Sequence, residues 1–383
     1  MRYLTAGESH GPALTVTVEG LPAGLPITIE QIGDELARRR LGFGRGPRMR
    51  FERDDVEFLG GVRHGVTLGS PVAIVIHNTE WPKWQEEMSP APGATEKPLR
   101  QPRPGHADLV GMQKYGFDDA RNVLERASAR ETAARVAAGA LAKALIAELG
   151  TEIVSHVIQM GVVRAEPGRR PTPADLGAVD DSPLRCFDPA AEQLMIAEVE
   201  ATQKAGDSLG GIVEVLGYGV PAGLGSHVHW DRKIDGLLGQ ALMSIQAMKG
   251  VEIGDGFEAA GLRGSQAHDE ILWDPAHGEY VRDTTRAGGT EGGMTTGALL
   301  VARAAMKPLA SLNKPVLRTV DTATKEETVS FKERTDVTAV PAAGVVAETM
   351  VALVLASESL RKFGGDSLAE FTRNHAAYVA SLA

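Results

Sequence analysis

Two segments of the chain share one pattern of hydrophobic and polar positions. Residues 7–25 read GESHGPALTVTVEGLPAGL and residues 206–224 read GDSLGGIVEVLGYGVPAGL, and they agree without a gap at their turn residues. Each pattern predicts a glycine turn, an apolar strand and a second turn. A chance similarity between two glycine-rich strands is the alternative, but the concentration of identities at turn positions favours a duplicated unit.

A helix is expected after each copy. Thr28 and Gln31 have the spacing of a helix capping box. An apolar helix face follows in both copies, formed by Ile29, Ile32 and Leu36 in the first and by Ile234, Leu237, Leu238 and Ala241 in the second. The chain is therefore predicted to consist of two pseudo-repeated halves, about 1–200 and 201–383.

His10 marks a difference between the two copies, because its counterpart is Leu209. The glycines and the serine recur in both copies, so turn geometry explains them. A titratable residue that replaces an apolar one at a repeated position is a better candidate for function. We therefore select His10 rather than the motif around it.

Two segments between the copies have distinct patterns. Six prolines in residues 78–105 exclude an α-helix and favour a lid, a binding loop or disorder. Residues 128–149 predict an alanine-rich helix with a capping box from Ser128 and Glu131, ended by Gly150. So many small residues allow close packing, so we expect this helix inside the molecule.

Composition narrows the setting of the protein. The 383 residues carry 40 Lys and Arg against 50 Asp and Glu, and a net charge of -10 argues against nonspecific nucleic-acid binding. Cys186 is the single cysteine, which excludes an internal disulfide, and no apolar leader opens the sequence, so we expect a cytoplasmic protein. Glu348 and Glu358 interrupt the most apolar stretch, 341–360, which predicts a buried helix rather than a membrane anchor.

Arginines cluster despite the acidic total. Seven lie within sixteen residues, namely Arg38, Arg39, Arg40, Arg45, Arg48, Arg50 and Arg53. The first three are expected in the last turn of a helix, where cations complement the dipole, so a solvated helix end is the alternative. Arg45 and Arg48 lie on a glycine loop and suit bidentate binding of carboxylate or phosphate. Arg126 and Arg130 lie beside the start of the 128–149 helix, where free N–H groups attract an anion.

Histidines supply further candidates. His106 lies in the sequence RPGHAD at the end of the proline-rich segment, beside Arg103, where it can act near an anion. A structural or exposed histidine is the alternative. His227 and His229 are two apart on an expected strand, but no third ligand has a recognisable spacing, so we predict no metal site.

Seven motifs occur in the order found in one enzyme family. They are GESHG from Gly7, RRRLGFGR from Arg38, RPGHAD from Arg103, RASARETAARVAAGA from Arg126, GDSLGG from Gly206, VPAGLG from Val220 and LMSIQAMKGVEIGDGF from Leu242. From its first residues to about Arg361, the chain resembles the chorismate synthase family. The resemblance implies one domain over residues 1–383 and an α+β fold, a layered β-α-β sandwich with helices between antiparallel sheets. It also implies a homotetramer.

The resemblance also implies an activity. Family members convert 5-enolpyruvylshikimate 3-phosphate to chorismate and phosphate, an anti-1,4-elimination in the shikimate pathway that requires reduced FMN without net redox change. A substrate with a phosphate and two carboxylates accounts for the arginines, and an electron-rich flavin can stabilise the allylic centre as the C–O bond breaks. Whether NADPH reduces FMN on the chain itself or an external flavin reductase supplies it stays open.

By the same resemblance, each candidate residue receives a role. His10 would hold a proton beside the flavin, His106 would protonate the departing phosphate, and Asp336 would help the flavin take the substrate proton. The substrate would be held by Ser9, Arg39, Arg45, Arg48, Arg103, Arg130 and Arg334. FMN would contact Arg126, Ala127, Ser128, Gln246, Ala247, Gly292, Lys307, Pro308, Leu309, Ala310, Ser311 and Arg334. The chain departs from common family residues at Ala127, Gln246 and Leu309-Ala310, where backbone groups are expected to replace side-chain hydrogen bonds to the flavin.

Two other functions fit parts of the sequence. An FMN-dependent oxidoreductase acting on a phosphorylated or carboxylated small molecule would bind the same cofactor, but the chain has no convincing dinucleotide fingerprint. An anion-binding scaffold without catalysis would need neither His10 nor His106. The elimination is therefore the preferred hypothesis.

Overall fold

Two antiparallel sheets form the outer layers of the computed structural model, which describes residues 1–44, 54–93, 95, 97–330 and 336–382. The first sheet has the strand order β1-β2-β7-β4, with bounds β1 (Arg2–Ala6), β2 (Ala13–Glu19), β4 (Asp55–Gly60) and β7 (Val72–His77). The second has the order β11-β16-β10-β8-β9, with bounds β8 (Glu152–Met160), β9 (Val163–Arg164), β10 (Gly211–Tyr218), β11 (Met248–Ile253) and β16 (Leu300–Met306).

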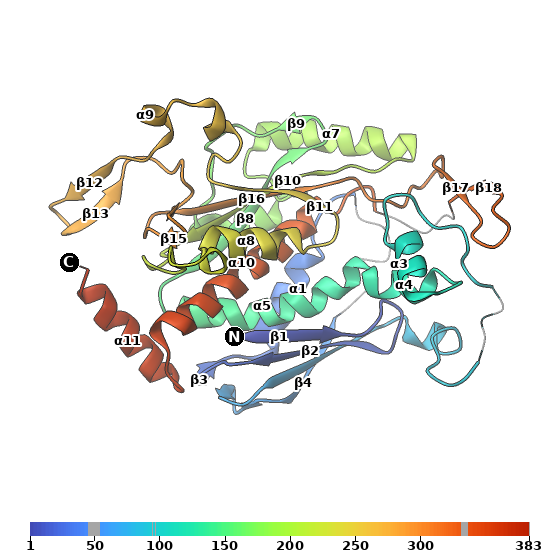
Figure 1. Ribbon diagram of the computed structural model, residues 1–383, viewed down its shortest axis with the longest axis horizontal. Coiled ribbons are helices and arrows are strands. Elements are labelled where there is room, and N and C mark those ends of the chain that lie inside the picture. Colours follow the sequence, from blue (N-terminus) through green and yellow to red (C-terminus); the bar gives the residue numbers. More distant parts are fainter. Residues whose placement is uncertain (45–53, 94, 96, 331–335, 383) are drawn as a thin grey trace.

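Long helices fill the space between these sheets (Figure 1). They are α1 (Ile29–Arg39), α5 (Thr132–Ala147), α8 (Ile234–Met243) and α10 (Val340–Phe363). Helix α5 packs against β2, α10 packs against β8 and β10, and the two helices pack against each other. Gly139 of α5 allows this close approach, because a Cβ there would collide with Thr349 of α10. The layered α+β architecture predicted for the family is confirmed.

Helix α10 contains the apolar segment noted in the sequence. It is long and apolar enough to cross a membrane, but 89% of its most apolar window is buried inside the protein. Its apolar residues contact both neighbouring layers rather than lipid. The prediction of a buried helix is confirmed.

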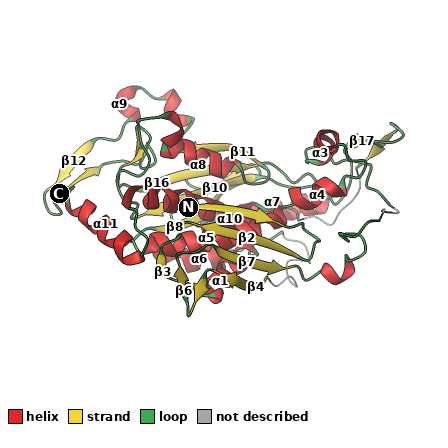
Figure 2. Cartoon of the chain, turned by 60° about the horizontal axis from the view of Figure 1, so that its bottom comes forward, coloured by secondary structure: helices red, strands yellow, loops and turns green. Residues whose placement is uncertain are grey.

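Smaller elements surround the sandwich. The other helices are α3 (Asp108–Tyr115), α4 (Arg121–Ala127), α6 (Leu176–Asp181), α7 (Pro189–Ala205), α9 (Gly264–Ala267) and α11 (Leu368–Ala380). The 3-10 turns are η1 (Trp81–Lys83), η2 (Ala129–Glu131), η3 (Pro173–Asp175), η4 (Trp230–Arg232) and η5 (Glu258–Gly261). A three-stranded sheet contains β3 (Ala23–Pro26), β5 (Val62–Arg63) and β6 (Val66–Leu68). Three two-stranded hairpins pair β12 (Ile271–Asp274) with β13 (Glu279–Arg282), β14 (Thr290–Glu291) with β15 (Met294–Thr295), and β17 (Arg318–Val320) with β18 (Glu327–Val329). Figure 2 shows α3, α4 and β17 gathered at one end of the elongated molecule and α11 and β12 at the other.

The two sheets are compatible with a duplicated chain. In each sheet, the strand that follows the repeated glycine turn, β2 or β10, lies between an earlier strand and a later one. Thr67 Oγ1 donates to Pro22 O at 2.6 Å and accepts from the Leu25 N–H at 3.0 Å. The same two bonds recur in the second half, from Thr295 to Pro221 at 2.6 Å and from Leu224 to Thr295 at 2.8 Å. The two pseudo-repeated halves stay a prediction that these equivalences support.

Of the two helix capping boxes predicted from the sequence, one is present and one is not. The capping box of Thr28 and Gln31 is present at the start of α1, as predicted. The one expected from Ser128 and Glu131 is wrong, because Ser128 Oγ accepts from the Arg130 N–H and caps a 3-10 turn instead. The Glu131 carboxylate is engaged elsewhere, and helix α5 begins only at Thr132.

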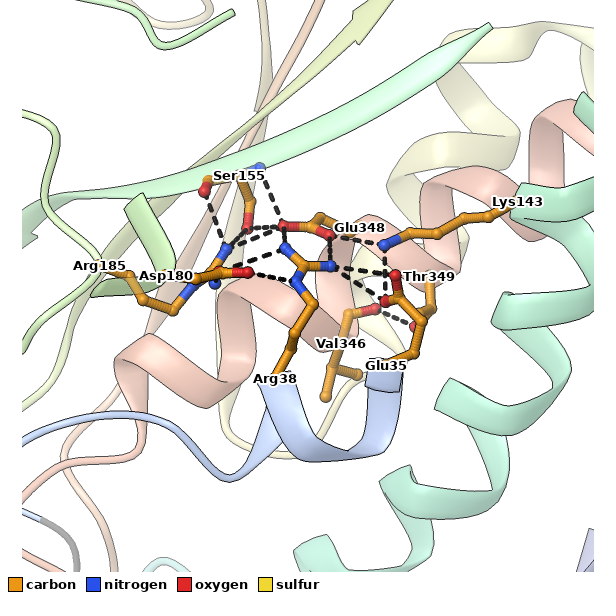
Figure 3. A network of polar contacts seen from close by, with 9 residues as sticks. All are labelled: Glu35, Arg38, Lys143, Ser155, Asp180, Arg185, Val346, Glu348 and Thr349. Atoms are coloured by element: carbon orange, nitrogen blue, oxygen red, sulfur yellow. Dashed lines mark hydrogen bonds and ion pairs between the residues drawn. The ribbon is translucent and has the colours of Figure 1, made fainter. Parts of the chain in front are cut away.

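A buried ionic network joins the helices between the sheets (Figure 3). Glu348 of α10 accepts hydrogen bonds from Arg38 of α1 at 2.7 and 3.0 Å and from Lys143 of α5 at 2.6 Å. Its other partners are Ser155 of β8 and Arg185, while Arg38 also pairs with Glu35 and Asp180. Arg38 is therefore not a solvated cation at a helix end. The network fixes the last turn of α1, which also carries Arg39.

Candidate active site

His10 lies in the first glycine turn and is held by Glu125 of α4. The two carboxylate oxygens of Glu125 lie 2.9 and 3.0 Å from His10 Nδ1, and the His10 backbone N–H donates to Oε2 at 2.9 Å. The Trp84 ring packs on the imidazole with 4.1 Å between centroids, and the Arg121 guanidinium lies 4.9 Å from the centre of the Trp84 ring. The N–H of buried Ser9 donates to Glu125 O at 3.1 Å. The His10 side chain is only 15% exposed as a result.

His106 is held in a similar way by Asp108, at the first residue of α3. Its Nδ1 forms a short hydrogen bond with Asp108 Oδ1, while Arg103 Nε donates to Asp108 Oδ2 at 2.8 Å. Arg103 Nη1 also donates to Ser311 Oγ at 3.0 Å. Burial alone would raise the pKa of Asp108, but the hydrogen bonds from His106 and Arg103 hold this pKa well below its usual range. Asp108 is therefore a buried, ionised acceptor at neutral pH.

The two histidines share one arrangement. Each presents Nδ1 to a buried carboxylate, and each carboxylate also binds an arginine, Arg121 at Glu125 and Arg103 at Asp108. Burial raises the pKa of Glu125, but the hydrogen bonds from His10 outweigh burial, and the pKa is lowered. At His106, Arg103 Nη2 also lies 3.1 Å from Nδ1 and 3.4 Å from Nε2. Because an ionised carboxylate only accepts hydrogen bonds, we assign the ring proton to Nδ1 in both histidines. Nε2 is then the nitrogen that can gain or lose one.

Two of the arginines selected from the sequence meet at Asp54. Arg130 Nη1 pairs closely with Asp54 Oδ1, and Arg39 Nη2 lies 3.9 Å from Asp54 Oδ2. Arg130 Nε donates to Asn78 Oδ1 at 3.0 Å, and Asn78 Nδ2 donates to Gly11 O at 2.8 Å. This chain of contacts connects the arginines to the turn that carries His10.

The first group of flavin candidates adjoins the same turn. Arg126 Nη1 donates to Gly7 O at 3.0 Å, and its Nη2 donates to Thr5 O at 2.8 Å. Ala127 is the last residue of α4, and Ser128 follows it as the cap of η2. The flavin candidates 126–128 therefore directly follow Glu125 in the chain.

The second group of flavin candidates consists of Gln246, Ala247 and residues 307–311. Gln246 Nε2 donates to Glu131 Oε2 at 3.0 Å. Ala247 has a φ of 67°, a left-handed conformation that is uncommon for alanine, and its carbonyl accepts from the Lys307 N–H at 3.0 Å. Lys307 Nζ donates to Gly105 O, so residues 307–311 lie against the loop that carries His106.

Gly292, another flavin candidate, lies away from this second group. It lies in the turn between β14 and β15, where Gly293 O accepts from the Ile234 N–H at 2.9 Å, at the first residue of α8. Gln246 follows the other end of α8, and a helix of ten residues is about 15 Å long. Within one chain, Gly292 and Gln246 are therefore separated by the length of α8.

Other predicted residues lie at or beyond the limits of the described chain. Arg45, Arg48 and Arg334 are outside the described residues. Asp336 is described and directly precedes Val337, whose N–H donates to Gly44 O at 2.8 Å. Asp336 therefore lies beside the chain segment that leads to Arg45.

Each histidine has a cavity near it. One of about 580 Å³ is lined by Trp84, which packs on His10, together with Glu80, Lys83, Glu87, Lys97, Leu99 and Arg121. Another of about 500 Å³ is lined by Arg103 and His106, together with Pro102, Pro104, Gly105, Leu109, Val110, Arg318, Thr319, Val320 and Glu327. The second cavity therefore has His106 in its wall beside Arg103 and Arg318, whereas the first adjoins His10 through the Trp84 ring.

Comparisons with known proteins agree over the whole chain. The family model described as chorismate synthase matches residues 1–360. Chorismate synthases from Streptomyces coelicolor and Salinispora tropica are 60% and 61% identical to the chain, with all of this chain and 98% and 99% of the relatives covered. The chain belongs to the chorismate synthase family. A crystal structure of chorismate synthase is 42% identical, with a TM-score of 0.80 over 100% of this chain and 98% of the other. The chain is accordingly a lyase.

The sequence did not single out the acidic partners in this chorismate synthase family member. Asp108 was visible as the last residue of RPGHAD, and Glu125 directly precedes the RASAR motif, but neither was assigned a role. Asp54 had no motif signal, and its importance follows only from its contacts with Arg39 and Arg130. A search for acids next to the histidine and arginine motifs would have found the first two.

The expectation that His227 and His229 lie on a strand is wrong. His227 and His229 lie in a bend before η4, not on a strand, so they do not share a strand face. The chain turns here because Ser226 Oγ accepts from the Val228 N–H at 3.2 Å. His229 Nδ1 lies 2.7 Å from Asp231 Oδ1 in an exposed pair.

Proposed function

We propose that this chain converts 5-enolpyruvylshikimate 3-phosphate to chorismate and phosphate by an anti-1,4-elimination that requires reduced FMN without consuming it. The observation that carries the proposal is the matched arrangement of His10 and His106, each with Nδ1 on a buried carboxylate. An elimination of phosphate needs a proton for the leaving group and a place for the proton removed from carbon. Two histidines that exchange protons only at Nε2 suit those needs.

The chain's own residues then have distinct tasks. His106, oriented by Asp108, would donate its Nε2 proton to the departing phosphate, and Arg103 beside it would bind the charge that develops. His10 would hold a proton at Nε2 at the opposite end of the reaction, and Asp336 would take part in moving the proton that leaves carbon. Substrate anions would be bound by Ser9, Arg39, Arg45, Arg48, Arg103, Arg130 and Arg334.

The residues around Gln246 fit a flavin. Gln246 Oε1 is buried and has no hydrogen-bond partner among the described residues, so it offers an acceptor for a ring N–H. We expect FMN to be held by residues 126–128, Gln246, Ala247, residues 307–311 and Arg334, with Gly292 contributed from beyond this group. When bound, reduced FMN supplies electron density that stabilises the allylic centre as the C–O bond breaks.

Assembly and setting follow from the same proposal. We expect a homotetramer in the cytoplasm, acting within the shikimate pathway and binding neither nucleic acid nor membrane.

An anaerobic single-turnover assay tests the proposal. Purified protein is mixed with photoreduced FMN and 5-enolpyruvylshikimate 3-phosphate, and chorismate is measured together with the flavin absorbance. We expect chorismate to form while FMN stays reduced at the end of turnover. Oxidation of one flavin per product would replace the elimination with an oxidoreductase, and binding without any product would leave only an anion-binding protein.

A further inference from the structure

We propose that Glu125 is a positioning residue that holds His10 in the tautomer needed for proton exchange at Nε2. The inference rests on the proposed function, in which His10 holds a proton during the elimination. Glu125 touches neither substrate nor cofactor in this account. It acts through His10.

The geometry at Nδ1 carries the inference. Glu125 Oε2 lies 2.9 Å from both the backbone N and Nδ1 of His10, and Oε1 lies 3.0 Å from Nδ1. The carboxylate is 2% exposed and ionised, so it can only accept hydrogen bonds. The neutral imidazole must then carry its proton on Nδ1 and present a lone pair at Nε2. The cationic imidazole keeps the same Nδ1–H bond and differs only at Nε2.

The carboxylate is itself held in place. Arg121 Nη1 donates to Glu125 Oε1 at 2.9 Å from the preceding turn of α4. The same arginine lies over the Trp84 ring, which packs on the imidazole of His10. The Ser9 N–H fixes the backbone of Glu125 to the glycine turn. Contacts from three parts of the chain therefore set both the ring plane and the tautomer of His10.

Two carboxylates among the described residues face His10, at unequal distances from its two nitrogens. A Glu80 carboxylate oxygen lies 4.0 Å from Nε2, beyond hydrogen-bond distance, whereas Glu125 is in direct contact with Nδ1. The proton on Nδ1 is thus committed to Glu125. Nε2 is the side of the ring that faces the more distant carboxylate.

Glu125→Gln tests the inference because it preserves shape while changing the hydrogen at Nδ1. The carboxylate accepts from the His10 N–H, from His10 Nδ1 and from Arg121 Nη1. An amide offers one acceptor oxygen in place of two, and its NH₂ lies within reach of Nδ1, so the proton on Nδ1 is no longer enforced and the tautomer with the proton on Nε2 becomes populated. An amide in place of the carboxylate behind a catalytic histidine is known to cost about 10⁴-fold in kcat by this route. We expect the single-turnover rate with prereduced FMN to fall by about 10² to 10⁴-fold, with KM changed by less than about threefold. Glu125→Asp, which keeps a carboxylate, should recover part of the rate.

Asp274→Asn is the matched control. Asp274 Oδ2 lies 2.7 Å from Nδ1 of His277, but that pair is on an exposed hairpin and the histidine side chain is 72% exposed. Loss of a carboxylate from this histidine should leave both rate and KM unchanged.

A double-mutant cycle separates positioning from a structural role. If Glu125 acts through His10, Glu125→Gln should cause no further loss of rate in a His10→Ala background. Losses that multiply would overturn the inference, since Glu125 would then act on something other than His10. A normal rate in Glu125→Gln with a slow His10→Ala would also overturn it, while the proposed function would stand. A normal rate in His10→Ala would instead remove the catalytic role of His10 and the inference with it.

Thermal unfolding and the size of the assembly are measured for every variant. If Glu125→Gln does not fold, the same cycle is run with Glu125→Asp, whose shorter side chain holds the carboxylate less well at Nδ1, so that its smaller residual loss of rate is compared in the two backgrounds. A loss confined to kcat that disappears in the His10→Ala background supports the inference. A loss of equal size in both backgrounds contradicts it.

Discussion

Arg38 and Glu348, 310 residues apart in the chain, form an ion pair with two hydrogen bonds in the interior of the protein, of 2.7 and 3.0 Å. Burial alone would raise the pKa of Glu348, but the charges of Arg38, Lys143 and Arg185 hold it well below its usual range. Burial also lowers the pKa of Arg185, to about 10, despite its contact with Glu348. The carboxylate is thus the shared partner of three cations, of which Arg185 is buried and Arg38 and Lys143 are partly buried.

Loss of the Glu348 charge should destabilise the protein strongly. Glu348→Gln leaves three cations without their common acceptor, and removing one member of a buried ionic group typically costs about 3 to 5 kcal/mol. Urea unfolding followed by circular dichroism measures the change. The control is Glu19→Gln, which breaks an exposed pair with Arg2 and should change the free energy of unfolding by less than about 1 kcal/mol. A loss in Glu348→Gln as small as the one expected for Glu19→Gln would show that the network adds no stability.

The lowered pKa of Glu214 predicts how the free energy of unfolding changes at acid pH. Burial raises its pKa, but His156 and Arg170 outweigh burial and lower it to about 2, from a usual value of 4.5. A carboxyl group with a lowered pKa stabilises the fold above the unfolded pKa, and this contribution is lost as pH falls through the folded pKa. The contribution at neutral pH is on the order of 3 kcal/mol.

We therefore expect the stability difference between the natural protein and Glu214→Gln to be constant above about pH 5 and to shrink steadily between pH 4.5 and 2. Thermal unfolding of both proteins over this range measures it, and the other carboxyl groups largely cancel in the difference. A gap that does not change with pH would contradict the assignment of a low pKa to Glu214.

Asp108 should matter for the chemical step through His106. Asp108→Asn presents an amide to Nδ1 of His106, so we expect the single-turnover rate of chorismate formation to fall by about 10² to 10⁴-fold. Arg103 loses a partner as well, so substrate affinity should also change. Asp231→Asn is the control, because its histidine, His229, is exposed. Equal rates in Asp108→Asn and Asp231→Asn would exclude a role for the buried carboxylate.

The internal repeat offers a comparison between chemistry and folding. His10→Ala and His106→Ala should each lower the rate by about 10² to 10⁴-fold with little change in thermal stability. Leu209, which takes the place of His10 in the second copy, is only partly buried against the core. Leu209→Ala should therefore cost less than the 2 to 5 kcal/mol typical of a fully buried leucine and should leave the chemical step unchanged. Normal rates in both histidine variants would remove their catalytic assignment.

Local patterns in the sequence determined much of the fold. The period of apolar residues placed β2, β10, α1 and α8, and the Thr28 box gave the start of α1 correctly. The alanine-rich segment was correctly predicted as an inner helix, since small side chains permit close packing whatever the neighbours are. The layered arrangement came from the family resemblance rather than from these patterns. A period reports which face of an element is buried but not what covers it.

Only the tertiary structure decided which charged groups are paired. Arg38 was expected in the last turn of a helix and lies there, but only the folded structure shows that it binds Glu348 from the other half of the chain. Glu125 is 115 residues from His10, and no spacing in the sequence connects them. Helix and strand periods arise from the backbone geometry of neighbouring residues, so they can be read along the chain. Ion pairs depend on which surfaces the folded backbone brings within about 3 Å, and that distance is set by packing across the whole molecule.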